Sequence, residues 1–373
     1  IEAPRACHVG ESGDKLIDSR DVNGFPQRCR THVNSLSNAC AGTAVGRGRV
    51  LPCERFQFQP MSRMSRDRLP VLIVANPKSG GGRAQRLVPR VAAELRRHGF
   101  PVAEFESHGP GEITERVRAI VEPLACVLVV GGDGTVREAL AGGLDLSVPL
   151  AVLPCGSANV LGTELGLPRR PAAAAQLMVD GHSELFDSGW LEPLGEPGQA
   201  GTGGNDRASF LLMVGAGIDA RVVDTVHRLR RGGTLGKLRY IGPALAEFLA
   251  YRAAAIWVTT DDGQRHGPFA QVVVTNVESY GALWKLPGHV SMQDGQLDVL
   301  GFRAGGRISM LRHTLLGTLN LLRIGPALWH RQVRQVKLDA DRSTPLQVDG
   351  DPGGRCPVSI RVAPASVRLI VRR

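Results

Sequence analysis

Two patterns of apolar and polar residues alternate along residues 71–180. Short runs rich in Val, Leu and Ala are typical of strands buried on both faces. Between them, apolar residues recur every three or four positions, as at Leu87, Val91 and Leu95, which is the period of a helix. Strands alternating with helices predict a parallel sheet covered on both faces. The expected strands are 71–76, 102–105, 128–130 and 150–153, and the expected helices are 83–98, 112–121, 172–180 and one beginning at 136.

The pattern changes after Gly181 to short strands separated by turns, which is typical of a mostly β domain. A last apolar strand, 367–371, is a candidate to return to the first domain. We therefore predict an α/β domain over 66–181, a β-rich domain over 182–362, and a C-terminal strand within 363–373. The other expected strands are 210–214, 256–260, 271–276, 297–302, 333–338, 346–348 and 358–362, with helical segments at 220–252 and 308–329.

Residues 1–65 show little periodicity and hold four of the seven cysteines. The chain begins with Ile1, whereas Met61 and Met64 lie just before the first expected strand. We interpret this segment as a disordered or spurious extension, because it offers little apolar surface to bury. A regulatory arm is the alternative.

Composition narrows the class of protein. The net charge is +10, with 43% hydrophobic and 21% charged residues, which fits a folded protein with an acidic partner. The seven cysteines form no CxxC pair, so no zinc site or disulfide framework is indicated. No apolar run reaches the ~18 residues of a membrane span, and no secretion signal is recognisable, so we expect a cytoplasmic protein. Aromatic residues are only 5% and no nucleic-acid-binding motif is present, which argues against nucleic acid as a partner.

Candidate chemistry lies where the expected parallel strands end, because ligands bind beyond the carboxyl ends of such strands. The loops at Asn76, Ser107, Gly131 and Gly156 all belong to that edge. A glycine loop followed by a helix start offers backbone N–H groups to an anion such as phosphate. Asp133, in the middle of the loop, suits a divalent cation or a proton. A tight turn with a capping aspartate is the alternative.

Six segments, in a fixed order, resemble the diacylglycerol kinase catalytic domain, with similarity also to sphingosine and ceramide kinases. The resemblance runs from about residue 71 to the C-terminus and implies an NAD kinase/diacylglycerol kinase-like α/β domain followed by a mostly β domain. The segments are NPKSG at 76–80, GGDGT at 131–135, GSANVL at 156–161, GIDA at 217–220, DGQLDV at 294–299 and VDGDP at 348–352.

The resemblance implies ATP-dependent, Mg²⁺-dependent phosphoryl transfer to a lipid hydroxyl, that of diacylglycerol or a related lipid. It implies that Asp133 lies near the catalytic Mg²⁺ and that Asp351 is the general base. It implies a structural Mg²⁺ held by Asp294 and by the backbone carbonyls of Ser291 and Gln296. From the residues alone, Asp351 and Asp294 are also compatible with ordinary turns, a type I turn for Asp351 and an Asp-Gly hairpin turn for Asp294. The implied ATP-binding residues are Asn76, Ser107, Gly131, Gly132, Asp133, Gly134, Thr135 and Ser157.

Four positions depart from the family pattern and leave substrate preference and rate open. They are Val160 in place of a frequent Asp, Thr163 in place of Arg, Arg137 in place of Asn, and Asp351 in place of the commoner Glu.

A lipid kinase must reach a membrane. Five arginines and Lys237 at 221–239 precede an apolar stretch at 241–249, and arginines flank a Leu-rich segment at 311–328. This pattern favours peripheral docking on an anionic membrane surface, at its inner face; ordinary amphipathic packing on the β domain is the alternative. Whether the chain forms a homodimer is left open.

Two other functions remain. NAD kinases share a GGDGT loop, but the candidate for their Asn-Glu pair, at 275–278, does not match. A catalytically weak lipid-binding or regulatory protein is the second alternative. The presence of both Asp133 and Asp351 argues against it.

Overall fold

The computed structural model divides the chain into two units, Ile1–Pro60 and Met61–Arg373, and the described residues all belong to the second. The expected extension at 1–65 lies outside the described residues, as do residues 232–249 and 311–327 of the two segments expected to dock on a membrane. The structure describes residues 69–194, 207–231, 254–280, 284–286, 289–303, 328–341 and 344–373. No helix in these ranges is both long and apolar enough to cross a membrane.

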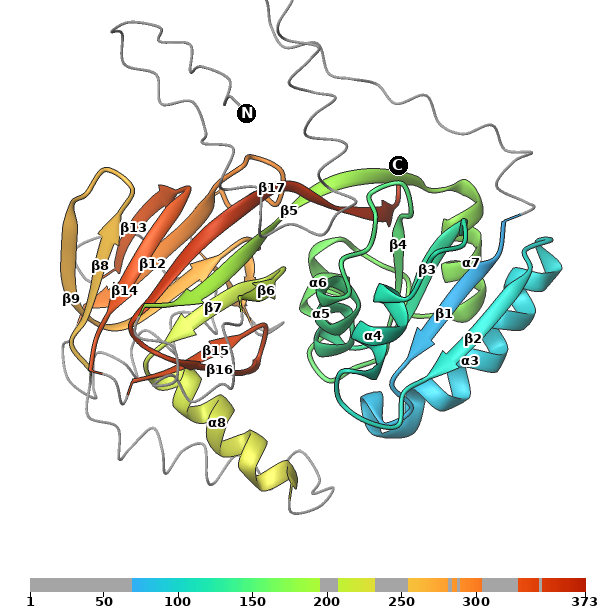
Figure 1. Cartoon of the computed structure of the whole chain (residues 1–373), viewed down its shortest axis with the longest axis horizontal. Coiled ribbons are helices and arrows are strands. Elements are labelled where there is room, and N and C mark those ends of the chain that lie inside the picture. Colours follow the sequence, from blue (N-terminus) through green and yellow to red (C-terminus); the bar gives the residue numbers. More distant parts are fainter. Residues whose placement is uncertain are drawn as a thin grey trace, which may run out of the picture. The chain divides into compact units, whose positions relative to one another are not determined.

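The first domain is built on a parallel sheet in the order β4-β3-β1-β2 (Figure 1). Every residue of β1, β3 and β4 is buried, which explains why their sequences are almost continuously apolar. The strands are β1 (Val71–Ala75), β2 (Val102–Glu106), β3 (Cys126–Gly131) and β4 (Leu150–Pro154).

Helices cover both faces of this sheet. Successive side chains of a strand point to opposite faces, so Ile73 packs with residues of α3 and α7, whereas Leu72 packs with residues of α4 and α5. The glycines at 80–82 have positive φ, so regular helix begins only after them, as the sequence predicted. The helices are α3 (Ser79–Arg97), α4 (Glu112–Arg118), α5 (Asp133–Ala141), α7 (Pro171–Asp180) and a short α6 (Val160–Glu164) that the sequence did not predict.

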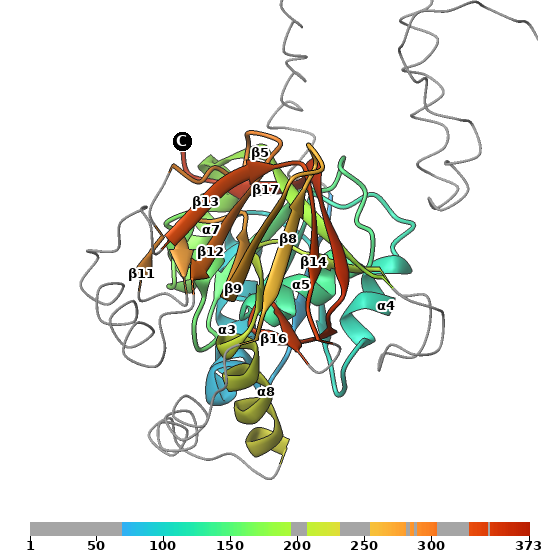
Figure 2. The same ribbon diagram turned by 90° about the vertical axis from the view of Figure 1, so that its left-hand side faces the viewer.

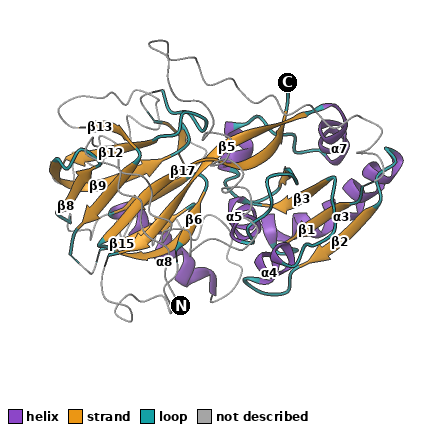
Figure 3. Ribbon diagram, turned by 45° about the horizontal axis from the view of Figure 1, so that its top comes forward, coloured by secondary structure: helices purple, strands orange, loops and turns teal. Residues whose placement is uncertain are grey.

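The second domain is antiparallel and β-rich, with its own apolar core. Figure 2 shows β13, β12, β9, β8 and β14 side by side, and Figure 3 shows α8 as the described helix that accompanies them. The fold class expected from the sequence is thereby confirmed. The elements are β5 (His182–Pro193), β6 (Ala208–Phe210), β7 (Met213–Ala216), α8 (Ile218–Arg231), β8 (Ile256–Thr260), β9 (Arg265–Thr275), β10 (Ser279–Tyr280), β11 (Trp284–Lys285), β12 (Leu297–Arg303), β13 (Leu328–Val333), β14 (Gln335–Asp339), β15 (Pro345–Val348), β16 (Asp351–Arg355) and β17 (Val358–Val371).

One long strand joins the two domains. β17 pairs with β14 and β5 in the second domain, and its Leu369 pairs in parallel with Leu150 of β4 in the first. The prediction of two separate strands at 358–362 and 367–371 was wrong. A register shift between Ala363 and Val367 interrupts the ladder without ending the strand, and the local sequence shows only the interruption.

The strand predicted at 210–214 is divided. β6 ends at Phe210 and β7 begins at Met213. The N–H groups of Leu211 and Leu212 donate to the Asp349 carboxylate, 2.9 Å away in each case, so this backbone leaves the strand ladder. The helix predicted to end at 329 was wrong at that end, because Trp329 lies in β13.

Candidate active site

The glycine loop joins β3 directly to α5. Gly132 has an extended backbone, α5 begins at Asp133, and the Thr135 N–H donates to the Gly132 carbonyl at 2.9 Å. The first N–H groups of α5 therefore lie at the carboxyl end of β3. Such helix starts favour bound anions, because their N–H groups have no partner within the helix.

Neighbouring loops meet at this edge. A Cβ atom on Gly156 would lie 2.5 Å from the Gly132 Cα atom, so the third and fourth loops touch only because both residues are glycine. A Cβ atom on Gly80 would lie 1.9 Å from the Cys155 carbonyl oxygen, so the first loop touches the fourth as well. The hydroxyls of Ser79 and Thr135 are 3.3 Å apart.

The predicted ATP-binding residues lie along these loops, in different environments. Asn76 accepts a hydrogen bond from the Lys78 N–H at 3.0 Å, which shapes the first loop. Ser107 is buried, and its N–H donates to the Ala75 carbonyl at 2.9 Å. Ser157 is exposed. The sequence did not single out Ser79, although its hydroxyl lies beside that of Thr135.

Asp133 caps a helix that the sequence did not predict. Its carboxylate accepts the N–H groups of Val160 and Leu161, the first residues of α6, at 3.1 and 3.2 Å. Burial raises the pKa of Asp133, and these backbone donors oppose the rise. A buried carboxylate with raised proton affinity suits a proton acceptor or a cation ligand.

Asp351 comes from the second domain and lies over the glycine loop. A Cβ atom on Gly134 would be 3.1 Å from the Asp351 Oδ2 atom. The same oxygen accepts a hydrogen bond from the Arg137 guanidinium, with 2.9 Å between Nη2 and Oδ2. Arg137 is one turn into α5, so this ion pair joins the glycine loop to β16. The structure thus brings the two predicted catalytic aspartates to one loop.

A second aspartate, Asp349, fixes this turn, and the sequence analysis missed its role. Its carboxylate accepts the N–H groups of Leu211, Leu212 and Met213, each at 2.9 Å. Burial raises its pKa to about 6, against the lowering effect of these donors. Its positive φ of 51° lets the chain reverse before Gly350. The only sequence signal for this role of Asp349 was the presence of two aspartates in the VDGDP segment at 348–352.

A buried polar chain extends from the turn. Gln347 accepts the Gly350 N–H through Oε1 at 2.8 Å and donates through Nε2 to Asp219 at 3.4 Å. Tyr280 donates to the same Asp219 oxygen at 2.9 Å. Burial raises the pKa of Asp219, and burial beside Asp219 raises that of Tyr280, so Tyr280 keeps the proton that it donates.

The predicted structural metal ligands form a separate, exposed turn. Asp294 accepts the Gln296 N–H at 2.9 Å and the Gln332 amide at 3.3 Å. The Ser291 hydroxyl accepts the Gln293 N–H at 3.2 Å. The described residues contain no group of three or more His, Cys, Asp or Glu side chains arranged to hold a metal ion. The assignment of Asp294 to Mg²⁺ therefore stays a prediction.

Two further aspartates lie near this turn. Asp187 accepts the N–H groups of Gly295 and Ala365, each at 2.7 Å. Asp298 pairs with His330 at 2.6 Å, while its buried Oδ2 has no hydrogen-bond partner in the described structure. Burial raises the pKa of Asp294, and the charges of Asp298 and Asp187 add to the rise. This negative field is the feature that favours a cation here.

Two family models match the chain. The diacylglycerol kinase catalytic domain matches residues 70–191, and the YegS C-terminal NAD kinase beta sandwich-like domain matches residues 212–371. These domains indicate a kinase of a lipid kinase family, which implies the use of ATP.

Curated and solved relatives agree with this family. The chain is 28% identical to a diacylglycerol kinase of Mycobacterium tuberculosis over 247 residues, 65% of this chain and 76% of the relative. It is 22% identical to a diacylglycerol kinase of Staphylococcus carnosus over 290 residues, 77% of this chain and 90% of the relative. A crystal structure of a putative diacylglycerol kinase from Bacillus anthracis matches with a TM-score of 0.63 and 22% identity, over 81% of this chain and 97% of that one. The structural match supports the fold alone.

Proposed function

We propose that the protein transfers the γ-phosphoryl group of ATP to the hydroxyl group of diacylglycerol or a related lipid. The observation that carries this proposal is the position of Asp351. A carboxylate of the second domain lies against the glycine loop of the first, with Arg137 of α5 bonded to its Oδ2. Phosphoryl transfer requires such a combination of phosphate-binding backbone and a carboxylate for the attacking hydroxyl.

Each group has a part in the proposed reaction. The backbone N–H groups at the start of α5 bind phosphate oxygens. The lipid hydroxyl oxygen bonds to the γ-phosphorus while the bond to the β–γ bridging oxygen breaks, and ADP leaves. The hydroxyl proton passes to a carboxylate, for which the family resemblance favours Asp351. Arg137 fixes the orientation of that carboxylate.

Carboxylate oxygens and phosphate oxygens are ligands that suit Mg²⁺. Asp133 is the residue that would hold the ion beside the phosphates, because its carboxylate is buried at the start of α5. The bound ion would neutralise charge on the phosphate groups. Asp294, with Ser291 and Gln296, would hold a second, structural ion.

A membrane surface is the proposed source of the lipid. The support comes from the sequence, where basic residues adjoin apolar stretches at 221–249 and 311–328. Net charge of +10 favours an anionic surface.

An assay of the full chain with ATP and Mg²⁺ tests the proposal. The acceptors are diacylglycerol, phosphatidylglycerol, sphingosine, ceramide and NAD. We expect transfer to one lipid, lost in Asp351→Asn. Transfer to NAD alone, or transfer that survives in Asp351→Asn, contradicts the proposal.

A conservative substitution is needed to test the role of Asp133 in the reaction. Asp133→Ala would remove two hydrogen bonds that cap α6, which costs about 1 kcal/mol or more, so lost activity could reflect lost structure. Asp133→Asn keeps one acceptor oxygen for the cap and removes the charge. We expect it to stop turnover with the thermal midpoint nearly unchanged.

Kinase activity toward NAD is the second candidate, and the environment of Asn276 argues against it. Asn276 is fully buried, and its amide donates to the carbonyls of Asp187 and Leu211 at 2.8 and 3.0 Å. An asparagine used in this way has no amide donor left for a dinucleotide. The acceptor panel above includes NAD for this reason.

A further inference from the structure

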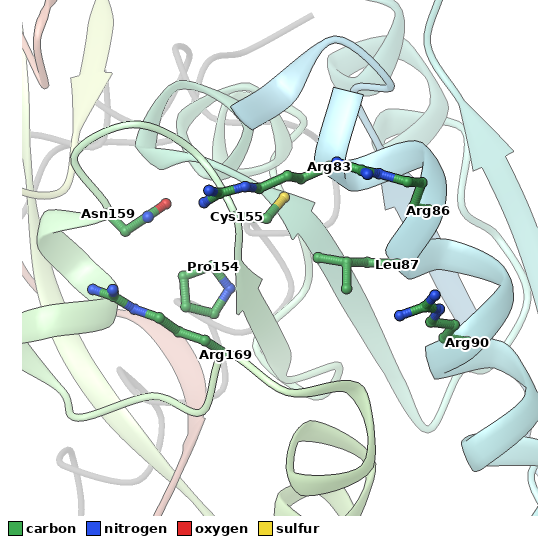
Figure 4. A pocket seen from close by; sticks show the side chains of 8 residues that line it. All are labelled: Arg83, Arg86, Leu87, Arg90, Pro154, Cys155, Asn159 and Arg169. Carbon is green, nitrogen blue, oxygen red and sulfur yellow. The ribbon is translucent and has the colours of Figure 1, made fainter. Parts of the chain in front are cut away.

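A cavity lined by arginines lies beside the glycine loop, on the α3 side of the sheet. Its volume is about 270 Å³, below the range typical of sites for drug-sized ligands. The residues that line it come from α3, from the end of β4 and from the loop before α7. They are Arg83, Arg86, Leu87, Arg90, Pro154, Cys155, Asn159 and Arg169 (Figure 4).

The charge of this cavity is not balanced by the protein. Its walls carry four guanidinium groups and no carboxylate. Within the described ranges, none of the four arginines has an ion pair with an aspartate or glutamate. All four arginines are partly open to solvent, and like charges that line one hollow favour a bound anion between them.

Asn159 gives an independent sign of a ligand. It is 7% exposed, and its Nδ2 donates to the Gly156 carbonyl at 2.9 Å, which fixes the amide orientation. Its Oδ1 is buried and has no hydrogen-bond partner in the described structure. Figure 4 shows the side chains of Arg83 and Arg169 reaching toward Asn159 from the two walls. A buried acceptor without a partner is rare unless a ligand or water supplies the donor. Because phosphate oxygens are acceptors, that donor would be a hydroxyl, an amine or a water beside the phosphate group, on the side of Asn159 that faces Gly156.

A second cavity lies on the other side of Arg90 from the first. It has a volume of about 550 Å³, shares Arg90, and adds Arg97 and Arg170 to apolar residues that include Ala93 and Ala172. An anion bound in the first cavity could therefore carry an apolar part that lies in the second. Within these two linings, only Glu94 is acidic, and it is paired with Arg97 at 2.9 Å.

We infer that the cavity between α3 and the loop before α7 binds a phosphate group, at a site separate from the one that holds Asp133 and Asp351. Guanidinium groups bind phosphate through paired, charge-assisted hydrogen bonds, which makes a phosphate ester the fitting class of anion. The phosphate comes from either a membrane lipid headgroup or a soluble phosphate compound. This inference does not depend on the proposed reaction, because binding can be measured without turnover.

The test uses the full chain and the double variant Arg90→Gln/Arg169→Gln, which removes one charge from each wall. The control is Arg116→Gln/Arg118→Gln, which makes the same change of net charge on α4, across the sheet from the cavity. Pyrophosphate binding is measured by calorimetry. Lipid binding is measured by sedimentation with vesicles that contain phosphatidic acid, against vesicles of equal charge that contain phosphatidylserine.

We expect the cavity variant to raise the dissociation constant for at least one phosphate probe about tenfold or more, since it removes two charged donors. The control should resemble the wild type. Loss confined to pyrophosphate identifies a soluble ligand, and loss confined to phosphatidic acid identifies a lipid. Equal binding by wild type and cavity variant overturns the inference. So does a raised KM for ATP in the cavity variant, which would make the cavity part of the nucleotide site.

Discussion

Two aspartate–glycine turns of the second domain make an instructive comparison. In each, a glycine with positive φ reverses the chain, Gly350 with 85° and Gly295 with 71°. In each, a buried aspartate fixes the turn by accepting backbone N–H groups: Asp349 for the first and Asp187 for the second. The local architecture is therefore alike.

The partners of the two turns differ. Asp351 meets a guanidinium of the first domain, 214 residues away in sequence, and lies over the glycine loop. Asp294 is bonded to the backbone of its own turn and to Gln332, beside the carboxylates of Asp187 and Asp298. One turn lies against the glycine loop, and the other lies in the negative field of its neighbours. Local sequence does not distinguish these cases.

The largest expected effect is a difference in kcat between variants of the two turns. Asp351→Asn should lower kcat about 100-fold or more, the usual contribution of a general base. Asp294→Asn should lower it by far less, because its contacts lie outside the glycine loop. Steady-state kinetics of both variants, with circular dichroism to check folding, measures the contrast. Similar losses in the two variants would mean that the turns share one function.

The parallel sheet could be predicted from the sequence, because apolar runs and the helical period of apolar residues are local signals. The glycine loop around Asp133 is likewise a local signal, whereas the proposed role of Asp351 came only from the resemblance to the family, because its own segment also fits an ordinary turn. Contacts between residues that are far apart in the sequence could not be predicted in this way. Asp133 caps α6 as well as facing the loop.

Other features also depend on distant partners. β5 alternates poorly, and it is ordered by the long pairing with β17. Asp349 takes its donors from residues 211–213, so neither the break between β6 and β7 nor the raised pKa could be predicted locally. The pairing of Arg137 with Asp351 joins two positions that depart from the family pattern, and only the folded chain brings them together.

Stability against pH should expose the raised pKa of Asp349. Burial gives the Asp349 carboxyl group a pKa of about 6 in the folded chain, against 3.8 for a free aspartate. Between these values the folded state holds a proton that the unfolded state has lost. The contribution of Asp349 is therefore full below about pH 4 and is lost as pH rises toward about 6.

The matched variant is Asp349→Asn, which does not titrate. The wild-type free energy of unfolding, minus that of the variant, should fall by on the order of 3 kcal/mol between about pH 4 and 6. Denaturant unfolding at a series of pH values measures it. A difference that stays constant with pH would show that the three backbone donors cancel the effect of burial, and a difference that rises with pH would show that they outweigh it.

Removing the partner of Asp351 should have a smaller effect on turnover. Arg137→Met leaves the carboxylate without its fixed orientation, and we expect kcat to fall about tenfold, the scale of one partly exposed charged hydrogen bond. In an Asp351→Asn background the same change should add little, because the two residues act as a pair. Additive losses in the double variant would mean that Arg137 acts on another group, such as a phosphate.

The smallest expected effect concerns Mg²⁺ at the second turn. If Asp294 holds the ion, Mg²⁺ binds the folded chain and raises its stability, by about 1.4 kcal/mol when the ion is tenfold above its Kd. Thermal melts with and without Mg²⁺ should show this rise in the wild type and a smaller one in Asp294→Asn. Asp133→Asn should keep the part of the Mg²⁺-dependent rise in stability that comes from the ion at Asp294. An equal rise in wild type and Asp294→Asn would leave Asp294 as an ordinary turn residue.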